Sequence, residues 1–226
     1  MSTGEPGTAK KRIVIVDDHP MLRTGLAKLI NDDPALSVAG EAATGLEALQ
    51  LVAAEVPDLV VADLSLPDKD GLTMLKELLE CVPSLPVLVL SIHDEMTYAE
   101  RVLRIGGRGY IMKVASGKQI KEAVFHVLAG EIYLSPAMHQ TMLNRLSAAP
   151  KYDGTFGVNC LTDRELQIYR QIGQGFKSNE IAAQLSISAK TVEAHCANIR
   201  AKLALDNASA LRRSAIEWSQ SNKAGR

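Results

Sequence analysis

Five polar side chains in the first half of the chain are of types that bind a divalent cation and a phosphoryl group. Each lies at or just beyond the downstream end of a short apolar run: Asp17, Asp18, Asp63, Ser91 and Lys113. Carboxylate oxygens are the ligands that Mg²⁺ prefers, and a lysine ammonium neutralises phosphoryl oxygens. A carboxylate can also act as a nucleophile and form an aspartyl phosphate. Together these residues would equip the chain to hold a metal ion beside a phosphoryl group.

The apolar runs that precede these residues are predicted to be parallel strands. They are short, rich in β-branched residues and separated by helix-length segments, which is typical of strands buried on both faces. The expected strands are Arg12–Val16, Ser37–Glu41, Leu59–Ala62, Pro86–Ser91 and Gly109–Ile111. Helical patterns begin near Met21, Gly45, Gly71, Met96 and Gly117. Five such repeats predict a five-stranded, doubly wound α/β sheet, and the carboxyl ends of its strands would gather at the edge where such folds bind ligands.

Each of these residues has a simpler interpretation when it is taken singly. A lone aspartate after a strand is usually a turn former or a helix cap. Asp18 could cap the helix that begins near Met21, and His19 is interpreted as a turn or capping group, not as a metal ligand. Several such residues in the right order favour a shared site. Asp63 is the best candidate nucleophile within it, since it ends the central strand and precedes a loop that contains Pro67.

Composition favours a cytoplasmic protein with two domains and no membrane association. The chain has 226 residues, a net charge of −1 and no apolar stretch near the ~20 residues that a membrane-spanning helix needs. Three widely spaced cysteines, Cys81, Cys160 and Cys196, fit neither a disulfide framework nor a zinc site and favour a reducing compartment. Met1–Lys10 lacks the apolar region of a signal peptide and is expected to be a disordered leader.

The two ends of the chain differ in charge and in pattern. Residues 151–226 contain 11 Lys or Arg and 7 Asp or Glu, whereas the rest contains 14 and 19. This asymmetry suggests nucleic-acid contact through the basic end. A short helix is expected from Ser135-Pro136 to about Leu146, followed by a linker at residues 149–154. Beyond it the expected elements are all helices: Asp163–Gln171, Asn179–Leu185, Ala189–Leu203 and Ala208–Ser219.

The two central helices of this end have the spacing of a helix-turn-helix, with a short turn at residues 186–188. At about 100° per residue, one face of the second helix is apolar: Val192, Cys196, Ile199 and Leu203. The opposite face is small or polar and suits a DNA major groove: Lys190, Glu193, Ala194, Ala197, Asn198 and Ala201. Residues at its edges or at helix starts suit phosphates: Lys177, Thr191, His195, Arg200 and Lys202. Periodicity alone is equally consistent with an ordinary helical hairpin.

The motifs of the first half resemble the receiver domain of two-component response regulators. They are Asp17-Asp18-His19-Pro20, the loop Asp63 to Gly71, the run ending at Ser91, and Gly109-Tyr110-Ile111-Met112-Lys113. The resemblance covers about residues 11–131 and implies a flavodoxin- and CheY-like fold. It implies that Asp63 accepts phosphate from a histidine kinase or a small phosphodonor, and that Asp17, Asp18, Asp63 and the Ser65 carbonyl bind Mg²⁺. It also implies that Lys113 pairs with the phosphoryl group while Ser91 and Tyr110 reorient.

The motifs of the second half resemble the DNA-binding domain of the LuxR, FixJ and NarL type. They are Leu161-Thr162-Asp163-Arg164-Glu165-Leu166, the segment Gly173 to Ala182, and the segment Ser188 to His195. The resemblance implies a four-helix unit in which Ala189–Leu203 reads double-stranded DNA and Asp206–Ser219 helps to form a homodimer. Many members carry a basic residue at the position of Glu193 or Ala197, so this chain is expected to bind DNA phosphates more weakly.

The resulting prediction is a NarL/FixJ-class transcription regulator, not an enzyme beyond its own phosphoryl transfer and dephosphorylation. Its predicted parts are a leader at 1–10, a receiver at 11–131, a linker with a short helix at 132–157 and a helix-turn-helix domain at 158–226. A histidine kinase, DNA, a second copy of the chain and RNA polymerase are the expected partners. Two alternatives are a constitutive DNA-binding regulator and a Mg²⁺-dependent phosphohydrolase with Asp63 as nucleophile. The hydrolase would need a further acid or base, for which Asp68 and Asp70 are poor candidates because they read as turn residues.

Overall fold

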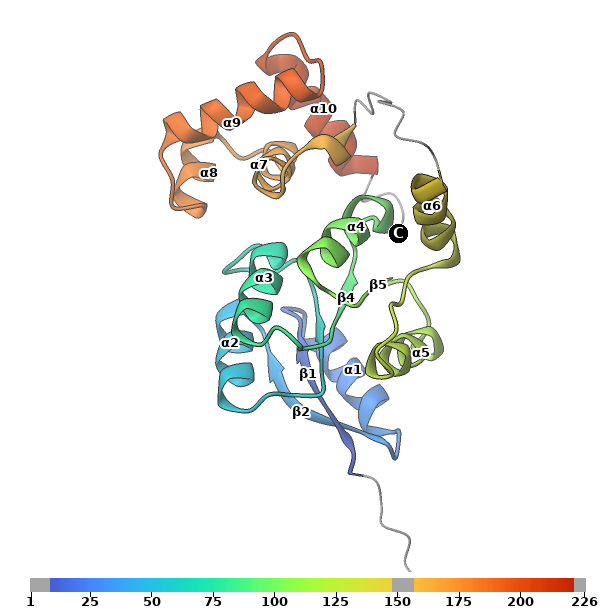
Figure 1. Cartoon of the computed structure of the whole chain (residues 1–226). Coiled ribbons are helices and arrows are strands. Elements are labelled where there is room, and N and C mark those ends of the chain that lie inside the picture. The colour runs from blue at the N-terminus through green and yellow to red at the C-terminus, as the bar shows by residue number, and fades with distance from the viewer. Residues whose placement is uncertain (1–8, 148–156, 222–226) are drawn as a thin grey trace, which may run out of the picture. The chain divides into compact units, whose positions relative to one another are not determined.

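The computed structural model describes residues 9–147 and 157–221, and the chain divides into two compact units, Met1–Arg145 and Leu146–Arg226 (Figure 1). Most of the predicted leader and all of the linker segment predicted at residues 149–154 therefore lie outside the described residues. No helix in the described part of the chain is both long and apolar enough to cross a membrane.

The first unit is a five-stranded parallel sheet covered by helices (Figure 1). Its strands are β1 (Lys11–Val16), β2 (Leu36–Ala42), β3 (Leu59–Ala62), β4 (Val87–Ser91) and β5 (Gly109–Met112). They lie in the order β2-β1-β3-β4-β5, which is the flavodoxin-like order. Its helices are α1 (Pro20–Asn31), α2 (Gly45–Ala54), α3 (Gly71–Cys81), α4 (Glu95–Ile105), α5 (Gly117–Leu128) and α6 (Pro136–Ser147). The predicted fold class is confirmed.

The sheet core explains why the strands read as continuous apolar runs. Every residue of β3 and β4 is buried, because helices cover both faces of the sheet. Helices α1 and α5 contact each other on one side, and α2, α3 and α4 form a contiguous layer on the other. The strand ends are therefore rigidly placed, and side chains attached there have little freedom to move.

Short capping sequences set where the helices begin. Thr44, Asp70, Asp94 and Ser116 each accept a hydrogen bond from the backbone N–H three residues on, at the starts of α2, α3, α4 and α5. Helix α1 differs, because its N-cap is His19, whose side chain makes no capping hydrogen bond, and Pro20 occupies the first turn. Asp18 therefore does not cap α1, and the simpler interpretation of that residue was wrong.

The loop after β3 closes on the start of α3 through a very close backbone approach. The Gly71 N–H donates to the Leu64 carbonyl at 3.1 Å, and a Cβ at Gly71 would lie 2.2 Å from the Leu64 Cα. Only glycine fits this approach, since the obstructing atoms are backbone atoms that cannot turn away. The loop that begins at Asp63 is thereby fastened at both ends.

The second unit contains only helices. A short 3₁₀ turn, η1 (Val158–Cys160), precedes α7 (Asp163–Gly173), α8 (Ser178–Gln184), α9 (Ala189–Lys202) and α10 (Ala208–Ser221). Thr162 and Glu165 form a capping box at the start of α7. Helix α9 contacts α7, α8 and α10, which makes it the central helix of the unit.

Replacing Gly71 by alanine should lower the free energy of unfolding by about 1–3 kcal/mol, because the added Cβ forces the Leu64 backbone to move. Urea denaturation followed by circular dichroism measures the change. Gly25→Ala is the matched control: a Cβ at this exposed α1 position meets nothing within 4 Å, and alanine should stabilise the helix by about 0.5–1 kcal/mol. Equal effects of the two substitutions would contradict the steric explanation.

Candidate functional site

Asp17 and Asp63 lie side by side at the carboxyl edge of the sheet. Val16 and Ala62 are paired residues of β1 and β3, and the next residue along each strand is one of the two aspartates. The Asp63 N–H donates to the Val16 carbonyl at 2.8 Å, which extends the strand pairing to the site. Each aspartate is only 1% exposed. Two buried carboxylates this close repel each other unless a cation lies between them.

Lys113 supplies that cation. Its Nζ lies 2.7 Å from Asp17 Oδ2 and 2.7 Å from Asp63 Oδ2, and its side chain is 8% exposed. The backbone of the lysine continues the pairing of β5 with β4, since its N–H donates to the Ser91 carbonyl at 2.8 Å. Lys113 therefore reaches from the end of β5 past β4 to the two aspartates, as its place in the sequence predicted.

Burial and charge act in opposite directions on these groups. Burial raises the pKa of Asp63, although the nearby Lys113 ammonium acts to lower it. Burial alone would lower the pKa of Lys113, but the Asp63 charge and hydrogen bonds to both aspartates outweigh it and raise that pKa. The ammonium is consequently held in its charged form, where it can attract a further anion.

The same edge contains a donor set that fits Mg²⁺. Ligand atoms of Asp17, Asp18, His19 and Asp63 all lie within 4.8 Å of one another. Asp63 Oδ1 is buried and has no hydrogen-bond partner in the described structure, although Oδ2 is bound by Lys113. A buried carboxylate oxygen without a partner is costly, and a hard cation or a phosphoryl group would satisfy it. The three carboxylates therefore fit the metal that the sequence predicted.

His19 lies closer to this cluster than the sequence suggested. Its Nδ1 is 2.5 Å from Asp18 Oδ1 and 3.2 Å from Asp17 Oδ1, and its backbone N–H donates to Asp17 Oδ1 at 2.9 Å. Its side chain is nevertheless largely exposed. The sequence interpretation as a local turn group agrees with the backbone hydrogen bond, whereas the ring contacts were not foreseen.

Ser91 and Tyr110 meet through the loop between β4 and α4. Tyr110 is completely buried, not half-buried as a strand aromatic usually is, and its hydroxyl donates to the His93 carbonyl at 2.8 Å. The His93 N–H donates to Ser91 Oγ at 3.4 Å. The His93 ring stacks on Tyr98, and its Nε2 is 3.0 Å from Ser65 Oγ. His93 thus connects the two predicted switch residues with the loop that follows Asp63.

The extra acidic residues of the β3–α3 loop have structural partners. Asp68 accepts hydrogen bonds from the Gly45 and Leu46 N–H groups at 2.9 and 3.0 Å. Burial acts to raise the pKa of Asp68, but these hydrogen bonds outweigh it and lower the pKa. Asp70 caps α3. Both residues are turn or cap residues, as their sequence context indicated.

The predicted DNA-facing side of α9 is exposed in the second unit. Val192 and Ile199 are buried, and Cys196 and Leu203 are half-buried, so the predicted core face is confirmed. The exposed positions are Lys190, Thr191, Glu193, Ala194, Ala197, Asn198 and Ala201. His195 and Arg200 are half-buried, and Lys177 is exposed at the start of α8. The helix therefore presents a face of small side chains with one exposed cation, Lys190, in its first turn.

Lys202 differs from the other predicted phosphate contacts. Its ammonium lies 2.7 Å from Glu165 Oε2, and the Glu165 side chain is only 4% exposed. Burial acts to raise the pKa of Glu165, but hydrogen bonds from Lys202 and Thr162 outweigh it and lower the pKa. Lys202 therefore fastens the end of α9 to the start of α7.

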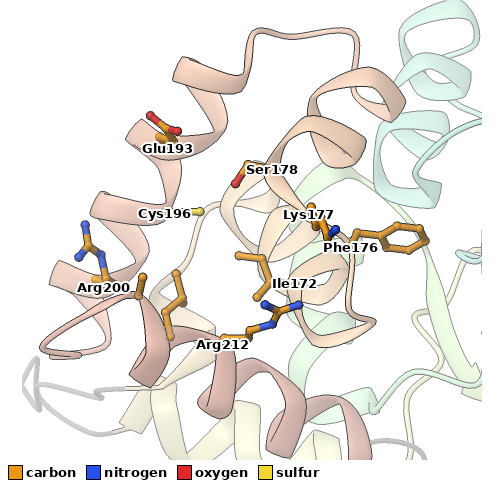
Figure 2. A pocket seen from close by; sticks show the side chains of 10 residues that line it. Ile172, Phe176, Lys177, Ser178, Glu193, Cys196, Arg200 and Arg212 are labelled. Atoms are coloured by element: carbon orange, nitrogen blue, oxygen red, sulfur yellow. The ribbon is translucent and has the colours of Figure 1, made fainter.

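A pocket beside α9 is lined by an arginine side chain that was not predicted as a functional residue. The cavity has a volume of about 510 Å³, and α8, α9 and α10 each contribute to its lining (Figure 2). Arg212 of α10 lines it together with Lys177, Cys196 and Arg200. The sequence places Arg212 within the expected dimer helix, and its position there gives no signal that it lines a pocket with the start of α8.

Comparison with known families agrees with both sites. The profile of the family described as "Response regulator receiver domain" matches residues 13–125. The profile described as "Bacterial regulatory proteins, luxR family" matches residues 159–215. The two matched segments fall on the two units of the chain, which are thus a receiver and a LuxR-type helix-turn-helix unit. The chain belongs to the LuxR-type, or NarL-class, response regulators, which are two-component transcription regulators.

Individual relatives support this family assignment over most of the chain. "Oxygen regulatory protein NreC" of Staphylococcus carnosus is 37% identical over 198 residues, covering 86% of this chain and 91% of the relative. Among solved structures, the chain is similar to RcsB from Salmonella enterica serovar Typhimurium, which is bound to promoter rprA in the presence of phosphomimetic BeF₃⁻. The two sequences are 25% identical, the TM-score is 0.70, and the match covers 90% of this chain and 97% of the RcsB chain. A LuxR-family response regulator from Aurantimonas sp. SI85-9A1 is 30% identical with a TM-score of 0.58 and covers 62% and 100%.

Replacing Lys202 by glutamine should destabilise the second unit by about 1–2 kcal/mol at pH 7, because a mostly buried carboxylate loses its cation. Since the folded pKa of Glu165 is lowered, this stabilisation is complete above its unfolded pKa of about 4.3 and is lost as the pH falls through the folded value. The difference between wild type and K202Q should therefore shrink below about pH 4. Unfolding is followed by fluorescence of Trp218, the single tryptophan. Lys190→Gln, on the exposed start of α9, should be neutral.

Lys190→Gln should instead weaken binding to a mixed-sequence duplex and reduce the slope of log K against log salt by about 1. The reason is that Lys190 is exposed at the start of α9, where its charge can reach a phosphate. Fluorescence anisotropy at several salt concentrations measures the slope. Lys118→Gln removes an exposed charge from α5 of the other unit and should leave the slope unchanged. A slope unaltered by K190Q would remove this residue from the interface.

Proposed function

We propose that Asp63 accepts a phosphoryl group and that this event controls DNA binding by the second unit. The observation that carries the proposal is the state of the Asp63 carboxylate. One of its oxygens is held by Lys113 at 2.7 Å, and the other is buried without a partner. This arrangement leaves one oxygen available as a nucleophile beside a fixed positive charge.

In this proposal Asp17, Asp18, Asp63 and the Ser65 carbonyl bind Mg²⁺. When bound, the ion neutralises the charge on the transferring phosphoryl oxygens. Asp63 Oδ1 attacks the phosphorus atom, a new P–O bond forms, and the bond from phosphorus to the donor breaks with its electron pair leaving on the donor. Lys113 is placed to follow the negative charge from the carboxylate to the phosphoryl oxygens. A phosphohistidine of a sensor kinase or a small acyl phosphate is the proposed donor, and hydrolysis of the aspartyl phosphate resets the site.

The proposed output is a homodimer that binds double-stranded DNA. Ser91 would turn toward the phosphoryl group and Tyr110 would respond through the loop that joins them, which shifts an equilibrium between receiver states. Two copies would then place their α9 helices in successive major grooves, ~34–36 Å apart. Glu193, Ala194, Ala197 and Asn198 would face base edges, while Lys177, Lys190, Thr191, His195 and Arg200 would lie nearest phosphates. Lys202, also expected to contact a phosphate, is paired with Glu165 and would have to share its charge.

Other features support the proposed setting and partners. The three cysteines are free, and two of them are exposed, which suits the cytoplasm. The RcsB relative is described as bound to a promoter, which supports DNA as the ligand of this chain. RNA polymerase is a further proposed partner once the protein is on DNA. The hydrolase alternative is weakened, since Asp68 and Asp70 already have structural partners.

Incubation with acetyl phosphate and Mg²⁺ should attach one phosphoryl group per chain at Asp63, because among the carboxylates that the structure describes this one combines a bound ammonium with an unpartnered oxygen. Mass spectrometry of the borohydride-reduced protein locates it. Asp63→Asn should abolish labelling, whereas Asp58→Asn, on the loop before β3, should not. Label at another aspartate would contradict the mechanism. DNA affinity that acetyl phosphate leaves unchanged in a labelled protein would favour the constitutive regulator.

A further inference from the structure

The segment that follows α5 pairs with the open edge of the sheet. β5 is the last strand in the sheet order, so one side of its backbone has no strand neighbour. Tyr133 occupies that side: its carbonyl accepts from the Tyr110 N–H at 2.9 Å, and its N–H donates to the Arg108 carbonyl at 3.0 Å. These bonds form a parallel bridge between Gly109 and Tyr133. The chain leaving the receiver is thus hydrogen-bonded to the backbone of a switch residue.

The residues around this bridge allow the two backbones to approach closely and bury the segment that follows. A Cβ at Gly109 would lie 3.1 Å from the Tyr133 carbonyl oxygen and 3.2 Å from the Tyr133 Cβ, so any larger residue would crowd the bridge. In the residues that follow Tyr133 along the chain, Leu134 is 4% exposed and Met138 of α6 is completely buried. The segment is therefore fastened by apolar burial as well as by hydrogen bonds.

A second hydrogen bond joins the same segment to the start of α4, directly after the β4–α4 loop. The Ser135 N–H donates to Glu95 Oε1 at 2.8 Å, and the Ser135 hydroxyl accepts from the Met138 N–H at 3.2 Å at the start of α6. Glu95 is the first residue of α4 and lies two residues after His93. The carbonyl of His93 accepts the Tyr110 hydroxyl. Residues 133–135 are therefore bound by two anchors, to β5 at one end and to the start of α4, directly after the β4–α4 loop, at the other.

We infer that residues 133–135 sense the position of the β4–α4 loop relative to β5 and pass its change to α6, the start of the connection to the DNA-binding unit. The inference rests on the proposed function, in which Ser91 moves toward a phosphoryl group on Asp63. The two anchors are two residues apart, a span of at most about 7 Å. The two hydrogen bonds are 2.8 and 2.9 Å long, and a donor–acceptor distance of about 3.6 Å no longer makes a hydrogen bond. A displacement of the loop by about 1 Å therefore breaks one anchor or moves the segment.

The geometry also assigns Glu95 a specific part in this coupling. Its carboxylate is the acceptor that joins the segment to α4, whereas the Tyr133 bridge uses only backbone atoms. Removing the carboxylate should release one anchor and leave the other. The segment would then follow β5 alone and lose its response to the loop.

Hydrogen–deuterium exchange of the full chain, with and without beryllofluoride and Mg²⁺, tests the inference. In the wild type the probe should slow exchange in residues 59–70 around Asp63 and change exchange in residues 131–143 by about tenfold or more, which is the scale of one charge-assisted hydrogen bond. Protection at 59–70 with no change at 131–143 would overturn the inference and leave the proposed function intact. No change at 59–70 would instead overturn the proposed function.

Three variants assign the effect to the anchor. In E95A, residues 131–143 should exchange faster without the probe and show no further change with it, while 59–70 stay protected by it. In E95Q, which keeps an acceptor oxygen, the response should persist. In E80A, which removes an exposed glutamate of α3, both regions should behave as in the wild type. A wild-type response in E95A, or an E95Q that behaves as E95A, would overturn the assignment to this hydrogen bond.

Discussion

The receiver depends on one ammonium held between two buried carboxylates. Asp17 and Asp63 are neighbours because β1 and β3 are paired, and two buried negative charges at that separation are unfavourable without a cation. In the sheet, β4 lies next to β3 and β5 lies next to β4. Lys113, at the end of β5, therefore reaches across the end of β4 to both aspartates. The order of the strands therefore brings the cation to the two carboxylates. In the proposed mechanism an incoming phosphoryl group would compete with the two carboxylates for this ammonium, so the interaction that stabilises the resting site would also make it responsive.

The strands at this site are fixed by burial, whereas the loops that follow them have contacts that can change. The residues of β3 and β4 are all buried, so the sheet can move little in response to a new charge at Asp63. The loops above have polar contacts that can exchange partners, such as Ser65 with His93 and Tyr110 with the His93 carbonyl. The loop after Asp63 is itself fastened where Gly71 meets Leu64. In the proposed mechanism a change at Asp63 would therefore pass to the β4–α4 loop, whose polar contacts can exchange partners.

The sequence predicted those features that depend on local pattern. Strand runs, helix caps and the apolar face of α9 follow from periodicity and from one or two residues at each boundary, and the strand ends then placed Asp63 beside Asp17. The contacts that it could not predict join single polar residues far apart in the chain. Glu95 and Ser135, or Glu165 and Lys202, carry no periodic signal, because each pairing depends on how two elements approach in three dimensions. Lys202 looked like a free cation at a helix end for this reason.

The charge distribution of the second unit gives a physical reason for control by the first. The exposed face of α9 consists mainly of small side chains, Lys190 is its one exposed cation, and Lys202 is already paired with Glu165. Few free charges on this face mean that α9 itself releases few counterions, so the α9 face of a single unit would gain little affinity from phosphates alone. Binding would then require two units acting together, since joining them makes the second contact intramolecular. Under that condition a receiver state that favours pairing sets DNA occupancy without altering any residue of the DNA-facing helix.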